Sequence, residues 1–271
     1  MTKILDQSQI EFFNQNGYLF PIKIMSKEKT LLYRNKLEKY EKSKGSLISG
    51  NERHKSHLLF QWVNEIVNNN KILDIVEDIL GPNLLCWSSN FFIKEPNENT
   101  FVSWHQDSEY WGLEPDDVVT AWFALSDANI NTGPMEVIPK SHKWKNINHN
   151  ETFNEKNLLS RGQELDINAS NHDTIAMPLN AGEISLHHVK LAHSSKINTT
   201  QDRRIGIAIR YTTPEVKQTK AIKIKDSALL VRGKDKYNNF IQEVPPKFDL
   251  DREAIENHRI ISEAHNKILM N

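Results

Sequence analysis

The sequence predicts a mainly β fold, a barrel or a sandwich with flanking helices, built as one domain of 271 residues. After Pro82, short β-rich runs follow one another and are separated by clusters of Asn, Asp, Gly and Pro, as in strands closed by turns. Before Pro82, apolar residues recur at helical spacing. A chain of this length can enclose one full core. We therefore expect helices that pack outside a β core.

The helices are expected in the first 80 residues. Asp6 or Ser8 is a suitable N-cap for a short helix that ends at Gly17. A second helix is expected from about Ser26, because apolar residues at i, i+4 and i+7 then share one face. Two more are expected over residues 58–68 and 70–80.

The strands are expected in the middle of the chain, at 84–94, 118–125, 135–138, 182–186 and 204–213. The polar, Asn-rich stretch 143–172 lacks periodicity, and we expect it to be a long excursion over the mouth of the barrel. The single domain then has a helical N-terminal part (about 1–81), a β core (about 82–215) and a C-terminal extension (about 216–271).

Composition excludes several classes of partner. Lys plus Arg (34) nearly balances Asp plus Glu (35), so no strong field favours nucleic acid or an anionic membrane. No stretch resembles a membrane span or a secretory signal. The single cysteine, Cys86, lies in an apolar run and is expected to be a buried thiol. We expect a cytoplasmic monomer or homodimer that acts on a small molecule.

The triplet His105-Gln106-Asp107 is the first candidate for chemistry. Two imidazoles and one carboxylate on one face of a metal leave three positions open, which suits iron(II) oxygenases. In an extended strand, residues i and i+2 point the same way, so this spacing can direct both side chains at one ion. Aromatic and apolar residues surround the triplet, as expected for a pocket. A second triplet, which begins at His149 and ends at Glu151, lies in the polar stretch and is interpreted as solvent-exposed.

The third ligand must come from another strand. His193 is the candidate, and His187 and His188 in the same segment are alternatives. If a loop follows, His193 and Arg204 lie near each other on adjacent antiparallel strands. The planar fork of an arginine suits the far carboxylate of 2-oxoglutarate, and the Ser195 hydroxyl can add a hydrogen bond.

His105-Gln106-Asp107 is followed far downstream by His193, and Arg204 comes eleven residues after His193. This set of residues resembles the phytanoyl-CoA dioxygenase family of Fe(II)/2-oxoglutarate oxygenases. The likeness extends over residues 118–122, 137–142 and 160–163, and covers roughly 84–240. Two turns depart from the family pattern. Where the family usually has Pro-Gly-Ser-His, this chain has Pro139-Lys140-Ser141-His142, and where the family usually has His-Gly-Ser, it has His193-Ser194-Ser195.

The resemblance implies a double-stranded β-helix, that is, a cupin-like jelly-roll barrel, with Fe(II), 2-oxoglutarate as cosubstrate and O2. It implies that His105, Asp107 and His193 bind the metal, and that Arg204, Ser195 and Thr120 bind the cosubstrate. The candidate substrate contacts are Trp104, Tyr110, Trp111, Arg161, Gln163 and Arg210.

The implied reaction is hydroxylation. Family halogenases resemble this pattern with a small residue in place of the carboxylate, so Asp107 favours hydroxylation over halogenation. The arginines favour a small anionic or zwitterionic substrate, such as an aminophosphonate like 2-aminoethylphosphonate, an amino acid or a natural-product intermediate. Two alternatives stay open, namely a zinc hydrolase on the same ligands and a non-catalytic jelly-roll binding protein.

Overall fold

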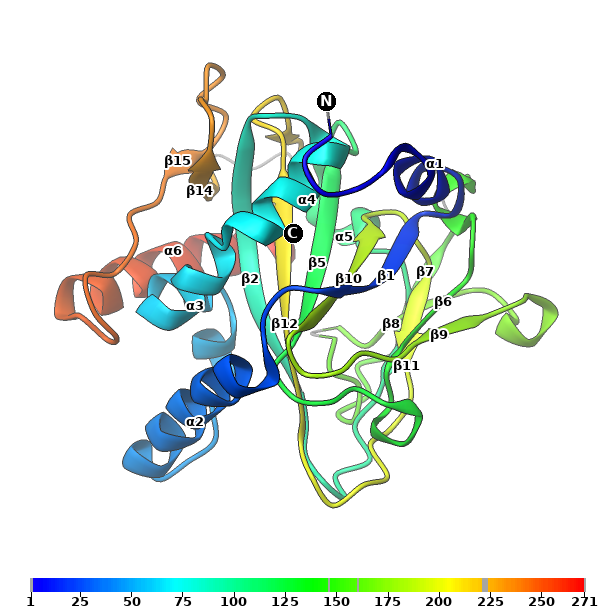
Figure 1. Ribbon diagram of the computed structural model, residues 1–271, viewed down its shortest axis with the longest axis horizontal. Coiled ribbons are helices and arrows are strands. Elements are labelled where there is room, and N and C mark those ends of the chain that lie inside the picture. The colour runs from blue at the N-terminus through cyan, green and yellow to red at the C-terminus, as the bar shows by residue number, and fades with distance from the viewer. Residues whose placement is uncertain (1, 146, 160, 221–223, 271) are drawn as a thin grey trace.

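The computed structural model (Figure 1) describes residues 2–145, 147–159, 161–220 and 224–270. Ser160, in one of the matched motifs, lies outside these ranges. Within them, two sheets form the core of the molecule. The seven-stranded sheet has the order β1 (Tyr18–Lys23), β10 (Glu183–His188), β5 (Val118–Ala124), β12 (Arg204–Thr212), β2 (Leu84–Lys94), β14 (Ser227–Arg232) and β15 (Ile241–Gln242).

The four-stranded sheet has the order β3 (Val102–His105), β11 (His193–Ser195), β6 (Met135–Val137) and β9 (Ile175–Met177). Two short pairs complete the strands, β13 (Lys217–Gln218) with β4 (Leu113–Glu114) and β7 (His149–Glu151) with β8 (Gln163–Leu165). The α-helices are α1 (Gln7–Asn16), α2 (Lys27–Lys44), α3 (Gln61–Val67), α4 (Asn70–Leu80), α5 (Ser108–Trp111) and α6 (Arg252–Met270).

The predicted helix signals in the N-terminal part are confirmed. The Asp6 carboxylate accepts the backbone N–H of Gln9 and caps α1, which ends at Gly17 with φ 84°. Ser26 caps α2 in the same way. The description of this part as wholly helical is wrong at Tyr18–Lys23, because these residues form β1 and pair with β10.

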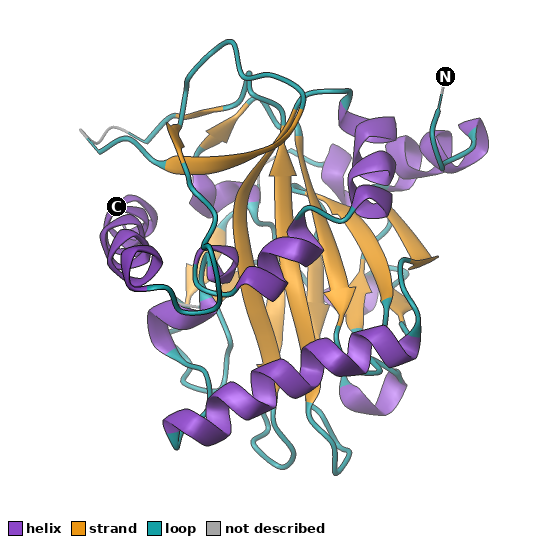
Figure 2. Ribbon diagram, turned by 60° about the vertical axis from the view of Figure 1, so that its left-hand side comes forward, coloured by secondary structure: helices purple, strands orange, loops and turns teal. Residues whose placement is uncertain are grey.

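The helices α2, α3 and α4 cover one face of the larger sheet, as Figure 2 shows. Side chains alternate along a strand, so each strand contributes one set of residues to either face. In β12, Ile205, Ile207, Ile209 and Tyr211 pack in one core cluster with Trp62 and other residues of the helices. The intervening residues, among them Arg204 and Arg210, face the interior between the sheets. Mainly β structure with helices outside it is thus confirmed.

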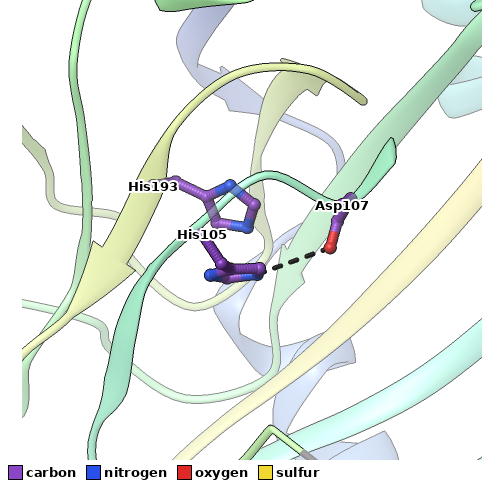
Figure 3. Close-up of side chains that lie close together, drawn as sticks. All are labelled: His105, Asp107 and His193. Atoms are coloured by element: carbon purple, nitrogen blue, oxygen red, sulfur yellow. Dashed lines mark ion pairs between the residues drawn. The ribbon is translucent and has the colours of Figure 1, made fainter. Parts of the chain in front are cut away.

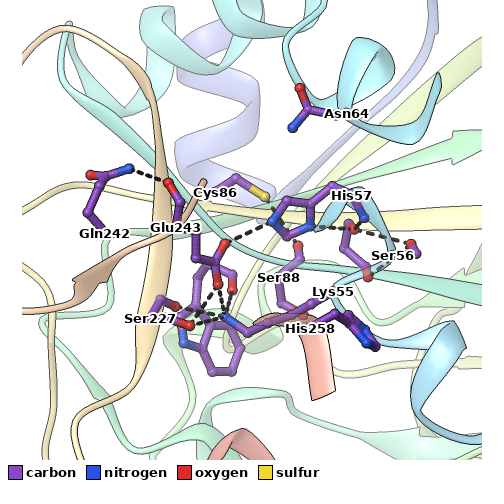
Figure 4. A network of polar contacts seen from close by, with 12 residues as sticks. Lys55, Ser56, His57, Asn64, Cys86, Ser88, Ser227, Gln242, Glu243 and His258 are labelled. Carbon is purple, nitrogen blue, oxygen red and sulfur yellow. Dashed lines mark hydrogen bonds and ion pairs between the residues drawn. The ribbon is translucent and has the colours of Figure 1, made fainter. Parts of the chain in front are cut away.

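A buried ionic network ties the N-terminal part to the C-terminal extension (Figure 4). The fully buried Lys55 ammonium donates to the Trp87 carbonyl at 2.8 Å, the Ser227 carbonyl at 2.7 Å and Glu243 Oε1 at 2.6 Å. The other carboxylate oxygen of Glu243 lies 2.9 Å from His57 Nε2. Although burial opposes ionisation, the charge of Lys55 and the contact with His57 lower the pKa of Glu243 to about 2.

Lys55→Met should lower the free energy of unfolding by roughly 3–5 kcal/mol, because it leaves Glu243 buried without its counter-ion. The double variant Lys55→Met/Glu243→Gln should lose less than Lys55→Met alone. Urea denaturation followed by circular dichroism measures both. The matched control Lys247→Met removes an exposed ion pair with Glu253. Its free energy of unfolding should fall by less than about 1 kcal/mol. Equal losses at Lys55 and Lys247 would contradict this account.

Candidate active site

His105, Asp107 and His193 come together in the interior (Figure 3), with one ligand atom from each within 4.8 Å of the others. His105 ends β3 and His193 begins β11, and the two are direct cross-strand partners. Their ring centroids lie 4.1 Å apart. Asp107 is not in the expected strand. Its backbone is helical (φ −66°, ψ −34°), at the N-cap of α5, so the turn out of β3 directs its carboxylate toward the imidazoles, with His105 Nε2 3.4 Å from Oδ1.

Both imidazoles are held in the tautomer that a metal requires. His105 Nδ1 lies 2.9 Å from the Ser103 carbonyl, and His193 Nδ1 lies 2.8 Å from the Leu191 carbonyl. A carbonyl only accepts, so each Nδ1 carries the hydrogen and each Nε2 keeps its lone pair for a metal.

The protonation states also suit a metal. Burial lowers the pKa of His193 well below its usual range. Burial opposes ionisation of Asp107, but the side chains of His105 and His187 hold its pKa well below the usual range. A neutral His193 imidazole and an ionised Asp107 carboxylate are therefore present together, and with the His105 imidazole they form a donor set that fits iron(II).

The alternative third ligands lie differently. His188 accepts the backbone N–H of Lys190 at its Nδ1 and packs against His142 with ring centroids 5.3 Å apart, so it does not join the cluster. His187 is buried beside the cluster, with Nε2 3.9 Å from Asp107 Oδ2. This distance is too long for a hydrogen bond. Among these three histidines, His193 is placed best as the ligand.

A cavity next to the cluster, here called the inner cavity, has an empty volume of about 420 Å³. Arg204 lies in its wall, buried, with its guanidinium carbon 5.2 Å from the ring centroid of Trp122. Nη1 donates to the Gly133 carbonyl at 3.0 Å, and Nε has no partner among the described residues. The expected adjacency of strands is wrong, because β11 and β12 belong to different sheets. His193 and Arg204 instead meet across the interior.

Two other predicted cosubstrate contacts line the same cavity. The Thr120 hydroxyl has no partner among the described residues. Ser195 Oγ accepts a hydrogen bond from Lys94 Nζ at 2.7 Å. Sequence reasoning missed Lys94, which ends β2 directly opposite Arg204 in β12. Burial and the charge of Arg204 lower the pKa of Lys94 to about 6. A lysine that ends an apolar strand was the signal available in the sequence.

Two glycines make room for the arginine. A Cβ on Gly206 would overlap the Trp122 ring, and a Cβ on Gly133 would overlap the Lys196 carbonyl. Gly133 also has φ +67°, which L side chains rarely adopt. Glycine at these positions lets Trp122 lie flat against β12 and lets the Gly133 carbonyl approach Arg204.

A second space, the outer cavity, meets the inner cavity at His105, Asp107, Phe92 and Arg210 and has an empty volume of about 970 Å³. Five of the six predicted substrate contacts line it, namely Tyr110, Trp111, Arg161, Gln163 and Arg210. The structure also places Arg53, His54, Asn90 and Leu269 there, none of which sequence reasoning identified.

The sixth predicted contact, Trp104, lines neither cavity. It lies on the opposite face of β3 from His105 and packs with Ile138, Leu165 and Ala192. Its predicted role as a substrate contact is therefore not supported, because side chains of successive strand residues point to opposite faces.

The polar stretch 143–172 carries the β7–β8 hairpin, and its residues Leu158, Leu159, Arg161 and Gln163 line the outer cavity. Interpreting His149 as solvent-exposed was wrong. It is half-buried, and its Nε2 accepts the backbone N–H of Gln106 at 3.0 Å.

The comparisons with known proteins agree with this geometry. Residues 13–206 match the model of the family described as phytanoyl-CoA dioxygenase. The chain belongs to the phytanoyl-CoA dioxygenase family. The predicted family is thus confirmed, and the predicted cofactors are those of this family of Fe(II)/2-oxoglutarate oxygenases. Among the described residues, no helix has the length and hydrophobicity to cross a membrane.

Two curated relatives show the range of this family. A probable alpha-ketoglutarate-dependent hypophosphite dioxygenase of Stutzerimonas stutzeri is 28% identical over 185 residues, 67% of this chain and 64% of that protein. Human peroxisomal phytanoyl-CoA dioxygenase is 23% identical over 235 residues, 78% of this chain and 70% of that protein. The match to the first relative thus covers slightly less than two thirds of its length.

The solved structures confirm the fold. The non-heme monooxygenase ThoJ, without ligand, is 31% identical with a TM-score of 0.84, over 96% of this chain and 97% of that chain. CytC3 with Fe(II) and alpha-ketoglutarate is 20% identical with a TM-score of 0.68, over 91% of this chain and 97% of that chain. The predicted cupin-like jelly-roll is the fold that these enzymes share.

Replacing a ligand should weaken metal binding and abolish activity without unfolding the chain. His105→Ala, Asp107→Ala and His193→Ala each remove one of three protein ligands, so each should weaken Fe(II) binding by at least about tenfold and abolish turnover of 2-oxoglutarate. Anaerobic Fe(II) titration and succinate release measure the two effects, with the exposed His172→Ala as control. Retained activity in His193→Ala, with loss in His187→Ala or His188→Ala, would refute His193 as the third ligand.

Arg204→Ala should weaken 2-oxoglutarate binding by roughly 2–5 kcal/mol, because a buried carboxylate would lose its counter-ion. Arg204→Lys should also bind the cosubstrate less well, since it lacks the planar fork. The dissociation constant of 2-oxoglutarate at saturating Fe(II) is the measurement. The control is Arg203→Ala, whose side chain pairs with Glu41 and Glu95 outside the cavity. A larger effect in Arg203→Ala than in Arg204→Ala would contradict this role.

Gly206→Ala should weaken 2-oxoglutarate binding although residue 206 carries no polar side chain. The new methyl group displaces the Trp122 ring and with it the guanidinium that lies over the ring. The ratio of 2-oxoglutarate to Fe(II) affinities, measured by titration, should fall relative to wild type. Ala208→Gly, on the same face of β12, is the control. An unchanged ratio in Gly206→Ala would show that the ring does not position Arg204.

Proposed function

We propose that this chain is an Fe(II)- and 2-oxoglutarate-dependent dioxygenase that hydroxylates a small anionic or zwitterionic metabolite. One observation carries the proposal. The cluster of His105, Asp107 and His193 opens onto the same buried cavity as Arg204, an arginine that has no carboxylate partner among the described residues. A metal site that catalyses only hydrolysis would not need a buried arginine such as Arg204 beside the metal.

The roles of the residues follow from their positions. His105, Asp107 and His193 hold the iron, which supplies oxygen activation when bound. Arg204 pairs with the far carboxylate of 2-oxoglutarate, and the Ser195 hydroxyl donates to its oxygens. Thr120, the other predicted cosubstrate contact, lines the same cavity beside Arg210. Lys94, by donating to Ser195 Oγ, leaves the hydroxyl hydrogen of Ser195 free to point into the cavity. Phe92, Trp122 and Met135 exclude water from the inner cavity.

The overall reaction balances without a further reductant. A C–H bond of the substrate is replaced by C–OH, and 2-oxoglutarate loses CO2 and becomes succinate. One atom of O2 enters the hydroxyl and the other enters succinate. Substrate and cosubstrate each supply two of the four electrons that O2 accepts.

The substrate class rests on the outer cavity. Arg53, Arg161 and Arg210 line it, and Arg161 is paired with Glu151. Among the described residues that line this cavity, Asp107, which is assigned to the metal, is the one carboxylate. Electrostatic complementarity then favours an anionic group. The relatives support small polar substrates, since one is named a hypophosphite dioxygenase and another an L-proline trans-4-hydroxylase of Streptomyces griseoviridis. The candidates remain an aminophosphonate such as 2-aminoethylphosphonate, an amino acid, or a natural-product intermediate.

We further propose that residues 1–271 form one domain, and that the protein is a cytoplasmic monomer or homodimer. Support for the location comes from Cys86, which is free and buried, with a pKa raised by burial. The overall balance of acidic and basic residues supports a small-molecule substrate rather than a nucleic acid.

The alternative functions, a zinc hydrolase and a non-catalytic binding protein, differ from the proposed one in the ligands that the protein would bind. Anaerobic addition of 2-oxoglutarate to the Fe(II)-loaded protein should produce a weak visible charge-transfer band, and admission of O2 should release succinate. A zinc hydrolase or a non-catalytic barrel would give neither. Asp107→Gly should lose hydroxylation without gaining efficient halogenation, because the surrounding residues are not arranged to hold a halide. Absence of the band in wild type, or a chlorinated product from it, would contradict the proposed function.

A further inference from the structure

Three polar side chains form a row across the larger sheet, next to the metal cluster. His187 of β10 pairs with Thr120 of β5, and Thr120 pairs with Arg210 of β12. All three are buried and line the inner cavity. Each keeps a buried polar atom without a hydrogen-bond partner among the described residues: His187 Nδ1, Thr120 Oγ1 and Arg210 Nε. Buried polar groups are nearly always paired, so three orphans in one row indicate a ligand.

Arg210 carries the charge in this row. Its guanidinium carbon lies 4.7 Å from the ring centroid of Trp111 and 6.0 Å from that of Phe92. Among the described residues no carboxylate lies within ion-pair distance of it, and the nearest charge that favours its ionised form is Asp107. Aromatic faces compensate a buried cation only in part, and an unpaired buried charge is costly. Arg210 therefore needs an anion that the described chain does not supply.

The source of that anion can be inferred from the charge balance of the site. This step rests on the proposed function. Fe(II) with the Asp107 carboxylate carries one net positive charge, and Arg204 carries another. The two carboxylates of 2-oxoglutarate neutralise both. Lys94 does not line the inner cavity, and its pKa, lowered to about 6, leaves it mostly uncharged at neutral pH. Arg210 is then the remaining buried cation, so one negative charge must come with the second substrate.

We propose that Arg210, Thr120 and His187 form a subsite for a singly charged oxyanion of the substrate, a phosphonate, phosphinate or carboxylate. Arg210 lines both cavities and so stands where the outer cavity meets the metal. The Thr120 hydroxyl and a His187 ring N–H are additional donors on one side of the same space. Arg204, six residues earlier on the same strand, binds the cosubstrate carboxylate. The substrate anion and the cosubstrate carboxylate therefore bind at separate arginines.

The subsite also fixes which bond faces the metal. His187 Nε2 lies 3.9 Å from Asp107 Oδ2, so an oxyanion in the row lies directly beside a metal ligand. The hydrogen that is replaced by hydroxyl is then on the atom that carries the oxyanion oxygens or on its neighbour, with O2 and 2-oxoglutarate as the oxidising pair.

The experiment uses the full chain, anaerobic, with saturating Fe(II) and 2-oxoglutarate. Calorimetric titration with hypophosphite, methylphosphonate and acetate tests the oxyanion, and acetamide is the uncharged match for acetate. At least one of the three anions should bind, and acetamide should not. In Arg210→Gln the dissociation constant of that anion should rise by about tenfold or more, with partial recovery in Arg210→Lys.

Two milder variants keep the test decisive if Arg210→Gln does not fold. Thr120→Val and His187→Phe each remove one donor and keep the volume, so each should raise the anion dissociation constant by roughly threefold to tenfold. In the Arg210 and His187 variants the dissociation constant of 2-oxoglutarate should stay within about threefold of wild type. Arg259→Gln, an exposed arginine of α6 paired with Glu256 and Glu263, is the matched control.

The outcomes separate this inference from the proposed function. A 2-oxoglutarate band in wild type without binding of any of the anions, or with acetamide bound as well as acetate, overturns the subsite and leaves the oxygenase intact. A rise in the 2-oxoglutarate constant, with the anion constant unchanged, assigns the row to the cosubstrate and also overturns it. Absence of the 2-oxoglutarate band in wild type refutes the proposed function itself.

Discussion

The two-residue alternation along β12 is the constraint on which both the core and the site depend. Ile205 and Ile209 pack under the helices, while Arg204 and Arg210 face the interior between the sheets. β12 pairs with β2 on one side and with β5 on the other, so its register is fixed twice. A slip by one residue would move both arginines into the apolar layer and the isoleucines into the cavity. The packing that stabilises the sheet is therefore also what positions the cations.

Local patterns in the sequence predicted much of this arrangement. The apolar run of β2 and the alternation of β12 are visible in the residues themselves, and so are the caps of α1 and α2. β1 could not be recognised in the same way, because what makes Tyr18–Lys23 a strand is its pairing with β10, more than 150 residues later. Propensity is a weak guide where a distant partner decides. The same limit misplaced β11, since the sequence shows that a loop follows His193 but not that it crosses to another sheet.

The same distinction between local patterns and long-range strand pairing applies to the candidate site. His105 and Asp107 were found because their spacing is local, although the bend that joins them is the start of a helix and not a strand. Lys94 was missed because its partner Ser195 is 101 residues away. His187 was considered only as a rival ligand, whereas the sheet places it beside Thr120 and the metal cluster. Residue types and spacing thus identify what binds a metal, but the polar wall around the metal depends on strand pairing.

Most of the residues that line the outer cavity lie within the family match, which ends at residue 206, but two lie beyond it. Arg210 follows it, and Leu269 lies at the end of α6, where its carbonyl accepts from Arg161 at 2.8 Å. α6 is held in place from the core, because the Asp226 carboxylate bonds the Trp87 indole at 2.7 Å and lies 3.3 Å from His265 of that helix. The matched region therefore contains the proposed metal ligands, the proposed cosubstrate arginine and most of the outer cavity, while Arg210 and the end of α6 complete the wall. Family membership accordingly accounts for the cofactors, whereas Arg210 and Leu269, which complete the wall of the outer cavity, lie outside the region that the family model covers.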